Sequence, residues 1–255
     1  MLRRLFSSRN SEPAAASAVP DGCVIYAVGD IHGRLDLLDR LHDKIACDAA
    51  RRTEPRKLLV YLGDYVDRGL ESRQVLDRLL DPPADGFERI LLKGNHEDAM
   101  LQFLDDTSIG ASWMGFGGDA TLYSYGVDVF GTPPDGVERL DFIQQMLRDN
   151  LPQSHVVLLQ RLQLCHVEGD YYFCHAGVRP GVALEAQSAQ DLMWIREDFL
   201  QSRKPLGKIV VHGHSIESEP VVTVNRIGID TGAFATGVLT ALVLAGQERS
   251  FLSTP

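Results

Sequence analysis

Short apolar runs and helical stripes alternate along the first third of the chain. Continuous, β-branched runs at residues 23–28, 57–62 and 89–92 predict buried strands. Apolar residues at helical spacing follow each run, at 35–51, at 75–80 and again after the third run. Strands that alternate with helices over short connections predict a parallel sheet with right-handed crossovers.

The second half of the chain changes to a pattern dominated by strands. Runs at 163–167 and 171–174 flank a Glu-Gly-Asp turn, which predicts a hairpin. The later expected elements are one helix at 192–199 and strands at 208–211, 221–224, 226–229 and 238–244. The whole pattern predicts an α/β fold with a second, mixed sheet.

Two segments differ in composition from these elements. Residues 1–20 carry Arg, Ser, Ala and Pro without a long apolar run, so we expect a flexible tail instead of a secretion signal. Residues 21–255 are expected to form one domain. Its stretch 105–150 is rich in Gly, Asp and aromatic residues, with a helix at 137–148. We interpret it as an insertion over the site, although a plain surface excursion fits almost as well.

Composition excludes some classes of protein. With 255 residues, 44% of them hydrophobic, the chain can bury a sizeable core. Its net charge of −10 argues against a nucleic-acid-coating protein, and no segment is apolar for long enough to span a membrane. The four cysteines form no C-x-x-C pair, so we expect buried free thiols and a cytoplasmic location. The oligomeric state cannot be derived from the sequence.

Potential metal ligands follow the ends of the predicted strands. The set is Asp30, His32, Asp64, Asn95, His175 and His214. Singly, such an Asp is usually a turn or cap residue and such a His a core residue. Six at successive strand ends favour a metal site, because the carboxyl ends of the strands meet at one edge of an α/β sheet. Carboxylate, amide and imidazole ligands without thiolate suit two divalent ions such as Mn²⁺, Fe²⁺ or Zn²⁺.

Three motifs resemble those of the PPP (calcineurin-like) metallophosphatase family: Gly29-Asp-Ile-His-Gly-Arg34, Gly63-Asp-Tyr-Val-Asp-Arg-Gly69 and Gly94-Asn-His-Glu97. His175-Ala-Gly177 and Val211-His-Gly-His214 resemble its two later motifs. This family includes bacterial Ser/Thr protein phosphatases and symmetrical diadenosine tetraphosphate hydrolases. The resemblance implies a sandwich of two mixed β-sheets flanked by helices, with the active site at the C-terminal strand ends.

The resemblance also implies a role for each matching ligand. Asp30 and His32 would bind the first metal, and Asp64 would bridge both ions. The second metal would be completed by Asn95, His175 and His214. Mn²⁺ is the expected ion in vitro, with Fe or Zn as alternatives.

Catalytic roles are expected for His96, Asp67, Arg68 and Arg196. His96 would be the general acid, since imidazolium can donate a proton at neutral pH, and Asp67 would orient it and raise its pKa. Arg68 offers forked donors to a phosphoryl group. Arg196, in Leu192-Met-Trp-Ile-Arg196, resembles the family's later arginine segment, although a charge on a helix surface is the other interpretation. Arg68, Asn95 and Arg196 are the expected substrate-binding residues.

Two positions depart from the related patterns. His212 lies on the wrong side of His214 to supply the extra ligand of binuclear nucleases, so we expect a core or supporting role. Leu70 replaces the small residue or proline that is common after Arg-Gly in the family, and we expect it to alter loop packing or substrate fit.

The favoured function is a Ser/Thr, or Tyr, phosphoprotein phosphatase that attacks phosphorus with a hydroxide held by two metals. Asp67 and Glu97 favour it by similarity. Symmetrical diadenosine tetraphosphate hydrolysis is the alternative, because enzymes of that group use nearly the same ligands, often with Ala in place of Asp67. A non-catalytic phosphatase-like binding module is disfavoured, because every ligand candidate is present. The expected partner is therefore a phosphoprotein, a phosphorylated small molecule or a nucleotide.

Overall fold

The structure is a computed structural model that describes residues 17–255. Most of the expected N-terminal tail, residues 1–16, lies outside the described residues. The last tail residues pack onto the body of the protein: Val19 is buried, and its N–H donates to the Gly246 carbonyl at 3.0 Å. The N–H of Ala18 donates to Asp170 at 3.0 Å. The packed chain thus begins before Pro20, where the tail was expected to end.

The first sheet contains the three strands predicted in the first third of the chain. β1 (Cys23–Val28), β2 (Arg56–Tyr61) and β3 (Phe87–Leu91) are parallel, and β9 (Thr240–Ala245) lies antiparallel to β1. The edge strand β10 (Glu248–Ser253) pairs with β9. β10 was not predicted, because its sequence is largely polar and most of its residues are exposed.

The second sheet has the order β4-β5-β6-β8-β7. Its bounds are β4 (Cys165–Glu168), β5 (Tyr171–Cys174), β6 (Ile209–His212), β7 (Val221–Val222) and β8 (Arg226–Gly228). β5, β6 and β8 are parallel, whereas β4 and β7 are antiparallel to their neighbours. Both sheets are therefore mixed, which confirms the predicted α/β sandwich.

Apolar residues on both faces of β1 explain the layered core. Val24, Tyr26 and Val28 face one apolar cluster, and Ile25 and Ala27 face another. Successive strand residues point to opposite faces, so a continuous apolar run is buried on both sides. The second cluster, which includes Ile25 and Ala27, fills the space between the two sheets.

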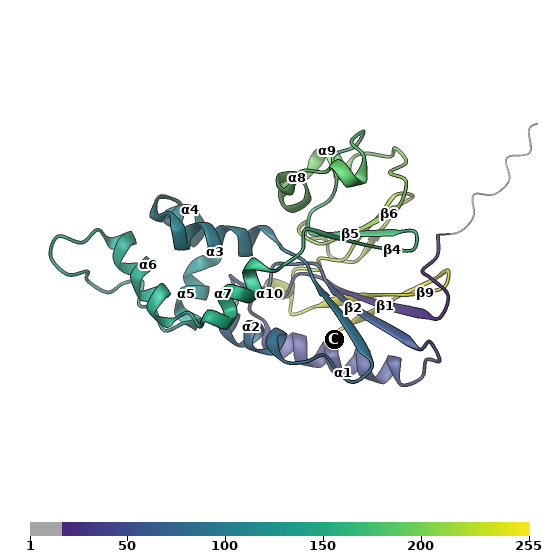
Figure 1. Ribbon diagram of the computed structural model, residues 1–255, viewed down its shortest axis with the longest axis horizontal. Coiled ribbons are helices and arrows are strands. Elements are labelled where there is room, and N and C mark those ends of the chain that lie inside the picture. The colour runs from purple at the N-terminus through teal and green to yellow at the C-terminus, as the bar shows by residue number, and fades with distance from the viewer. Residues whose placement is uncertain (1–16) are drawn as a thin grey trace, which may run out of the picture.

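Helices cover the outer faces of the sandwich (Figure 1). α1 (Leu35–Ala49) and α2 (Ser72–Leu80) lie against the first sheet, and α8 (Ala189–Trp194) and α9 (Glu197–Leu200) against the second. The single helix predicted at 192–199 is wrong, because the backbone breaks at Arg196 (φ −130°, ψ −100°) between α8 and α9. In the described part of the chain, no helix combines the length and apolarity that a membrane crossing requires.

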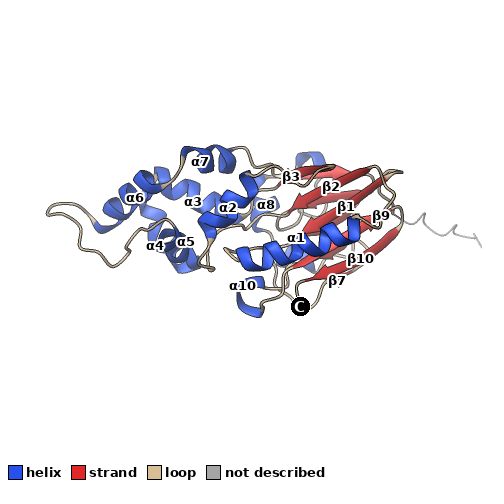
Figure 2. Cartoon of the chain, turned by 90° about the horizontal axis from the view of Figure 1, so that it is seen from below, coloured by secondary structure: helices blue, strands red, loops and turns tan. Residues whose placement is uncertain are grey.

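The segment 105–150 is mostly helical and extends beyond one end of the sheets (Figure 2). Its α-helices are α4 (Gly110–Trp113), α5 (Asp119–Ser124) and α6 (Arg139–Asn150). The segment is preceded by α3 (Asn95–Asp105) and followed by α7 (Gln153–Gln160). Shorter helices are Thr107–Ile109, the π-helix Met114–Gly118, Leu184–Ala186 and α10 (Ala233–Thr236). Glycine has a low helix propensity, so the glycines near α4 did not predict these helices, and Gly117 leaves helical geometry with φ 104°. The division into a tail and one domain with an insertion stays a prediction.

The cysteines are all free, as expected, but they are not all buried. Cys23 and Cys174 are buried, and Cys165 is partly exposed. Cys47 is exposed on α1, so the expectation of a buried thiol is wrong there. It lies on the polar face of an amphipathic helix, whose buried stripe contains Leu41 and Ile45.

Candidate active site

Strained loops at the strand ends carry the predicted site residues. Among the described residues, the non-glycine positions with positive φ are His32, Asp64, Asp67, Arg68 and His214. Such backbone conformations are costly for ordinary residues and persist where the surrounding fold imposes them. They follow β1, β2 and β6, at the edge where these strands end. The fold therefore holds these residues in unfavourable backbone conformations that direct their side chains to one place.

Asp64 lies at the centre of two groups of potential ligands. Its Oδ2 lies 3.4 Å from His175 Nε2, which is 2.9 Å from Asn95 Oδ1 and 3.2 Å from His214 Nδ1. On its other side, Asp64 Oδ2 lies 3.6 Å from His32 Nε2. Ligand atoms of Asp64, His175 and His214 lie within 4.8 Å of one another, and so do those of His32, Asp64 and His96.

Asp30 reaches the same cluster from the end of β1. Its Oδ2 accepts the backbone N–H of His214 at 2.9 Å, whereas its buried Oδ1 has no hydrogen-bond partner among the described residues. A Cβ on Gly213 would come within 1.9 Å of this Oδ1, so only glycine leaves room for the carboxylate there.

These residues fit a pair of divalent cations. A buried carboxylate oxygen without a donor is costly unless a cation neutralises it, and Asp30 Oδ1 is such an atom. Carboxylates, an amide oxygen and imidazoles are suitable ligands for Mn²⁺, Fe²⁺ or Zn²⁺. Two groups that share Asp64 accommodate two ions better than one.

The electrostatics of the cluster reflect the crowding of buried charges. Burial and then the neighbouring Asp230 raise the pKa of Asp30 well above its ordinary value. Burial opposes ionisation of Asp64 too, but His175 and His96 hold its pKa well below the usual range. Burial lowers the pKa of His175, and Asp64 more than compensates, raising it to about 9. Opposite shifts in adjacent groups are a common feature of functional sites.

His96 and Asp67 form a buried pair beside the cluster. His96 Nδ1 lies 2.6 Å from Asp67 Oδ2. The Asp67 carboxylate also accepts hydrogen bonds from Trp113 Nε1 at 3.0 Å and from Thr121 Oγ1 at 2.6 Å. Trp113 and Thr121 belong to the segment 105–150 and were not predicted to support the site. The segment 105–150 therefore holds Asp67, the hydrogen-bond partner of His96, in place.

Arg68 spans the rings of His32 and His96. Its Nη1 lies 2.9 Å from His32 Nε2, and its Nη2 lies 3.2 Å from His96 Nε2. Its guanidinium carbon lies 4.6 Å from the centre of the Phe234 ring, and this cation–π contact helps to orient the guanidinium group. Arg196 is exposed at the break between α8 and α9, near enough to His214 for its charge to act on that ring.

The described geometry agrees with the comparison with known families. Residues 23–232 match the calcineurin-like phosphoesterase family. The chain belongs to this family. It is a hydrolase of phosphoester bonds, and the resemblance in its sequence motifs is confirmed. Divalent metal ions are implied by the family and by the donor set.

Relatives of this phosphoesterase act on different substrates. The asymmetrical bis(5'-nucleosyl)-tetraphosphatase PrpE of Bacillus thuringiensis is 24% identical over 236 residues, which is 84% of this chain and 88% of the relative. Serine/threonine-protein phosphatase 2 of Escherichia coli is 42% identical over 96 residues, covering 37% of this chain and 38% of the relative. A crystal structure of a Shewanella protein-tyrosine phosphatase is 16% identical with a TM-score of 0.54, covering 92% of this chain and 83% of that one. At that identity, the structural likeness supports the fold alone.

Two buried acids of the phosphoesterase add to the expected site. Glu97, noted in the sequence only for its similarity to a family motif, accepts backbone N–H groups of Asp64, Tyr65, Val66 and Gly94 at 2.7–3.2 Å. Asp230 was missed, although it follows the second sheet's β8 closely, just as the other acids follow their strands. Asp230 could have been found as an Asp at a strand end, but Ile229 precedes it, whereas a glycine precedes Asp30 and Asp64.

His212 lies outside the ligand cluster of the phosphoesterase, in accordance with its expected supporting role. Its ring is buried, with Nδ1 2.9 Å from the Gly213 carbonyl and Nε2 3.3 Å from Arg226 Nη1. The ring also packs edge-on against Phe199 of α9 at 5.0 Å between centres. It thus joins the end of β6 to the helices that cover the second sheet.

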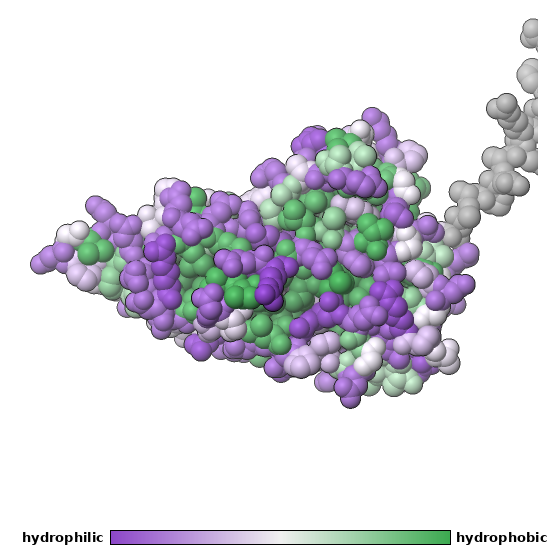
Figure 3. Space-filling model, viewed as in Figure 1, coloured by the Kyte–Doolittle hydropathy of each residue, from purple (hydrophilic) through white to green (hydrophobic). Residues whose placement is uncertain are grey.

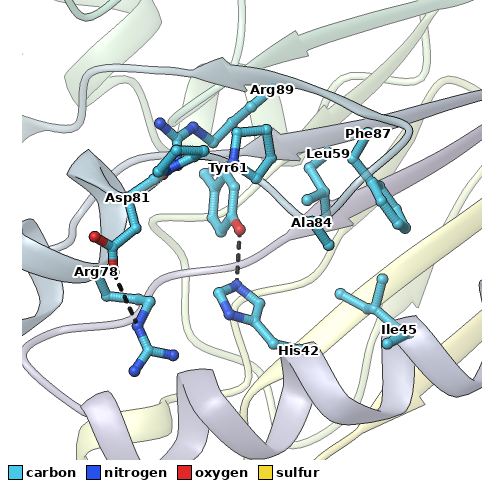
Figure 4. Close-up of a pocket in the computed structure, with 12 residues that line it drawn as sticks. His42, Ile45, Leu59, Tyr61, Arg78, Asp81, Ala84, Phe87 and Arg89 are labelled. Carbon is cyan, nitrogen blue, oxygen red and sulfur yellow. Dashed lines mark hydrogen bonds and ion pairs between the residues drawn. The ribbon is translucent and has the colours of Figure 1, made fainter.

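Among the cavities formed by the described residues, two lie beside the first sheet or its loops. One, of about 610 Å³, opens beside Arg68 and is lined by segments 117–120 and 123–130. The other, of about 310 Å³, lies between α1 and the α2–β3 connection, where His42 Nε2 is 2.7 Å from the Tyr61 hydroxyl (Figure 4). The second cavity contains none of the predicted site residues. The molecular face seen in Figure 3 is largely hydrophilic, with its apolar areas divided by polar side chains.

Proposed function

We propose that this phosphoesterase removes the phosphoryl group from phosphoserine or phosphothreonine in protein substrates, with His96 as general acid. The observation that carries the proposal is the 2.6 Å contact of His96 with Asp67, whose carboxylate has two further donors. The alkoxide of serine or threonine is a much stronger base than ADP or ATP, so its departure depends on a proton donor. A firmly held acid suits a phosphomonoester with such a leaving group.

We assign the ligands of two metal ions as follows. Asp30 and His32 would hold one ion, and Asp64 would contribute to both. Asn95, His175 and His214 would complete the ligands of the second ion. Mn²⁺ is the first choice in vitro, with Fe or Zn as alternatives. Bound ions would supply Lewis acidity, which would lower the pKa of a water molecule and neutralise charge on the phosphoryl oxygens.

The protein's own residues bind the substrate and move the proton. The forked donors of Arg68 and Arg196, with the amide of Asn95, hold the phosphoryl oxygens. His96 donates from Nε2 to the leaving oxygen, because its Nδ1–H is directed to Asp67. Asp67 thereby fixes both the tautomer and the orientation of the ring.

Hydrolysis of dinucleoside tetraphosphates is the second candidate. It is supported by the similarity to PrpE over most of both chains. PrpE is named as an asymmetrical hydrolase, whereas the sequence motifs led us to expect the symmetrical reaction. The products separate the two: symmetrical cleavage of diadenosine tetraphosphate yields ADP alone, and asymmetrical cleavage yields AMP and ATP.

The test compares leaving groups in Mn²⁺-loaded wild type and His96→Ala. The substitution is expected to lower kcat by about 10²–10⁴-fold on a phosphoserine peptide and far less on p-nitrophenyl phosphate, whose leaving group needs no proton. His166→Ala, a half-buried histidine of β4, is the matched control and is expected to retain activity. An equal loss of kcat on both substrates would remove His96 from the acid role. A wild type that cleaves only diadenosine tetraphosphate would favour the second candidate.

A further inference from the structure

Arg68 belongs both to the candidate site, where it contacts His96, and to the wall of the cavity beside it. Its walls include Arg68, Leu70, Asp119, Tyr123 and Phe130, and we call this cavity the Arg68 groove. The backbone N–H of Arg68 donates to the Gly117 carbonyl at 3.0 Å, which joins the loop after β2 to the helical wall of the groove. About 610 Å³ is much more than a phosphoryl group fills and is within the usual range of ligand pockets.

Three large apolar side chains are exposed around this groove. The exposed fractions are 61% for Leu70, 68% for Tyr123 and 86% for Phe130. Exposed apolar side chains scattered singly are normal, but several at the rim of one cavity are typical of a binding surface. Leu70 is also the position at which the sequence departs from the common family pattern. The departure therefore adds apolar surface to this groove.

The charge of the groove is acidic apart from Arg68. Asp119 and Asp128 line it, and among residues 17–255 Arg68 is the one cationic side chain of its lining. Each carboxylate accepts one local N–H through Oδ1: Asp119 from Ala120 at 2.9 Å and Asp128 from Phe130 at 2.8 Å. No described residue hydrogen-bonds the second oxygen of either acid. If Arg68 binds the phosphoryl group, the carboxylates of Asp119 and Asp128 are left to attract a positively charged side chain.

We propose that the Arg68 groove binds the segment of a phosphoprotein next to the phosphorylated residue, and that it selects an apolar side chain accompanied by Lys or Arg. This inference rests on the proposed phosphatase function. The apolar side chain packs on Leu70, Tyr123 and Phe130, and the basic side chain pairs with Asp119 and Asp128. A dinucleoside polyphosphate fits less well, because its chain of phosphates would extend its negative charge towards the two acids.

The experiment measures kcat/KM of the full-length, Mn²⁺-loaded enzyme on matched phosphoserine peptides. One peptide carries Leu and Arg beside the phosphoserine, a second carries Gly and Arg, and a third carries Leu and Glu. p-Nitrophenyl phosphate has no flanking segment and serves as the reference. Diadenosine tetraphosphate tests a nucleotide occupant. The wild type is expected to prefer the Leu-Arg peptide by about tenfold over each of the other two.

Two double variants separate the apolar from the charged contribution. Tyr123→Ala with Phe130→Ala is expected to lower the ratio of kcat/KM on the Leu-Arg peptide to that on p-nitrophenyl phosphate by about tenfold. Asp119→Asn with Asp128→Asn keeps the Oδ1 acceptors and removes the charge. It is expected to abolish the preference for Arg over Glu, and the wild-type preference should weaken in high salt.

Controls use similar side chains remote from the groove. Phe251→Ala on β10 and Asp85→Asn near β3 change an exposed aromatic and an exposed acid. Both are expected to keep the wild-type peptide preference. Equal rates on all three peptides with the wild type would overturn the proposed peptide selection by the groove but would leave the proposed phosphatase function standing. Activity on p-nitrophenyl phosphate with none on any phosphopeptide would overturn both. A loss confined to diadenosine tetraphosphate in the Tyr123 and Phe130 variant would assign the groove to a nucleotide base.

Discussion

The carboxylate of Asp67 is fully buried and accepts hydrogen bonds from the side chains of His96, Trp113 and Thr121. Burial lowers the pKa of His96, but Asp64 and the hydrogen bond to Asp67 raise it by more, so it lies above the ordinary value. A general acid works while it is protonated. Activity that depends on His96 should therefore fall as the pH rises through this elevated pKa.

Asp67→Asn removes the negative charge beside His96 and lowers the pKa of that ring. The alkaline limb of the pH profile of kcat/KM on a phosphoserine peptide should move to lower pH, and kcat should fall by about 10–10²-fold. Steady-state kinetics across the pH range check this. Asp85→Asn changes an exposed acid near β3, remote from the groove, and serves as the control for the alkaline limb. An Asp67→Asn limb that coincides with that of the wild type would show that Asp67 does not set the pKa of His96.

At the scale of elements, Glu97 ties the start of α3 to the loop that follows β2. Its carboxylate accepts N–H groups from Asp64, Tyr65 and Val66 of the loop and from Gly94. Asp64 and Asp67 of the same loop have positive φ, so the loop needs such anchoring. A Cβ on Gly94 would come within 2.1 Å of Asp64 Oδ1, so only glycine leaves room for this carboxylate there.

Glu97→Gln replaces an acceptor of several N–H groups with an amide whose NH₂ faces those donors. We expect the free energy of unfolding to fall by about 1–3 kcal/mol, because at least one buried N–H loses its acceptor. Urea denaturation followed by circular dichroism measures it. Glu248→Gln on β10 replaces an exposed carboxylate and is the control. An unchanged urea midpoint for Glu97→Gln would mean that the loop holds its shape without this anchor.

The elements differ in how far the sequence could predict them. The strands with continuous apolar runs and the helix stripes of α1 and α2 were predictable, because burial imposes a period. β10 was missed as a polar edge strand, and glycines concealed α4 and α5. The break at Arg196 was missed because the apolar pattern continues across it. Helical periodicity therefore gave too long an element there.

At the scale of the whole molecule, two sheets bring ligands from distant parts of the chain to one edge. The predicted ligands extend from Asp30 to His214, and their convergence could be expected because parallel strands end together. Trp113 and Thr121 could not be expected to contact Asp67. No local pattern tells which remote helix will reach a given carboxylate, since that depends on how the segment 105–150 packs.

We propose that this convergence creates a site for two cations to which Asp64 contributes jointly. The most direct measurement is the metal content of the folded protein after saturation with Mn²⁺ and removal of excess ions, by plasma mass spectrometry. We expect two ions for each wild-type chain and fewer than one for Asp64→Asn, with circular dichroism showing that the variant is folded. A wild type that retains a single ion, or an Asp64→Asn variant that retains both, would contradict the account.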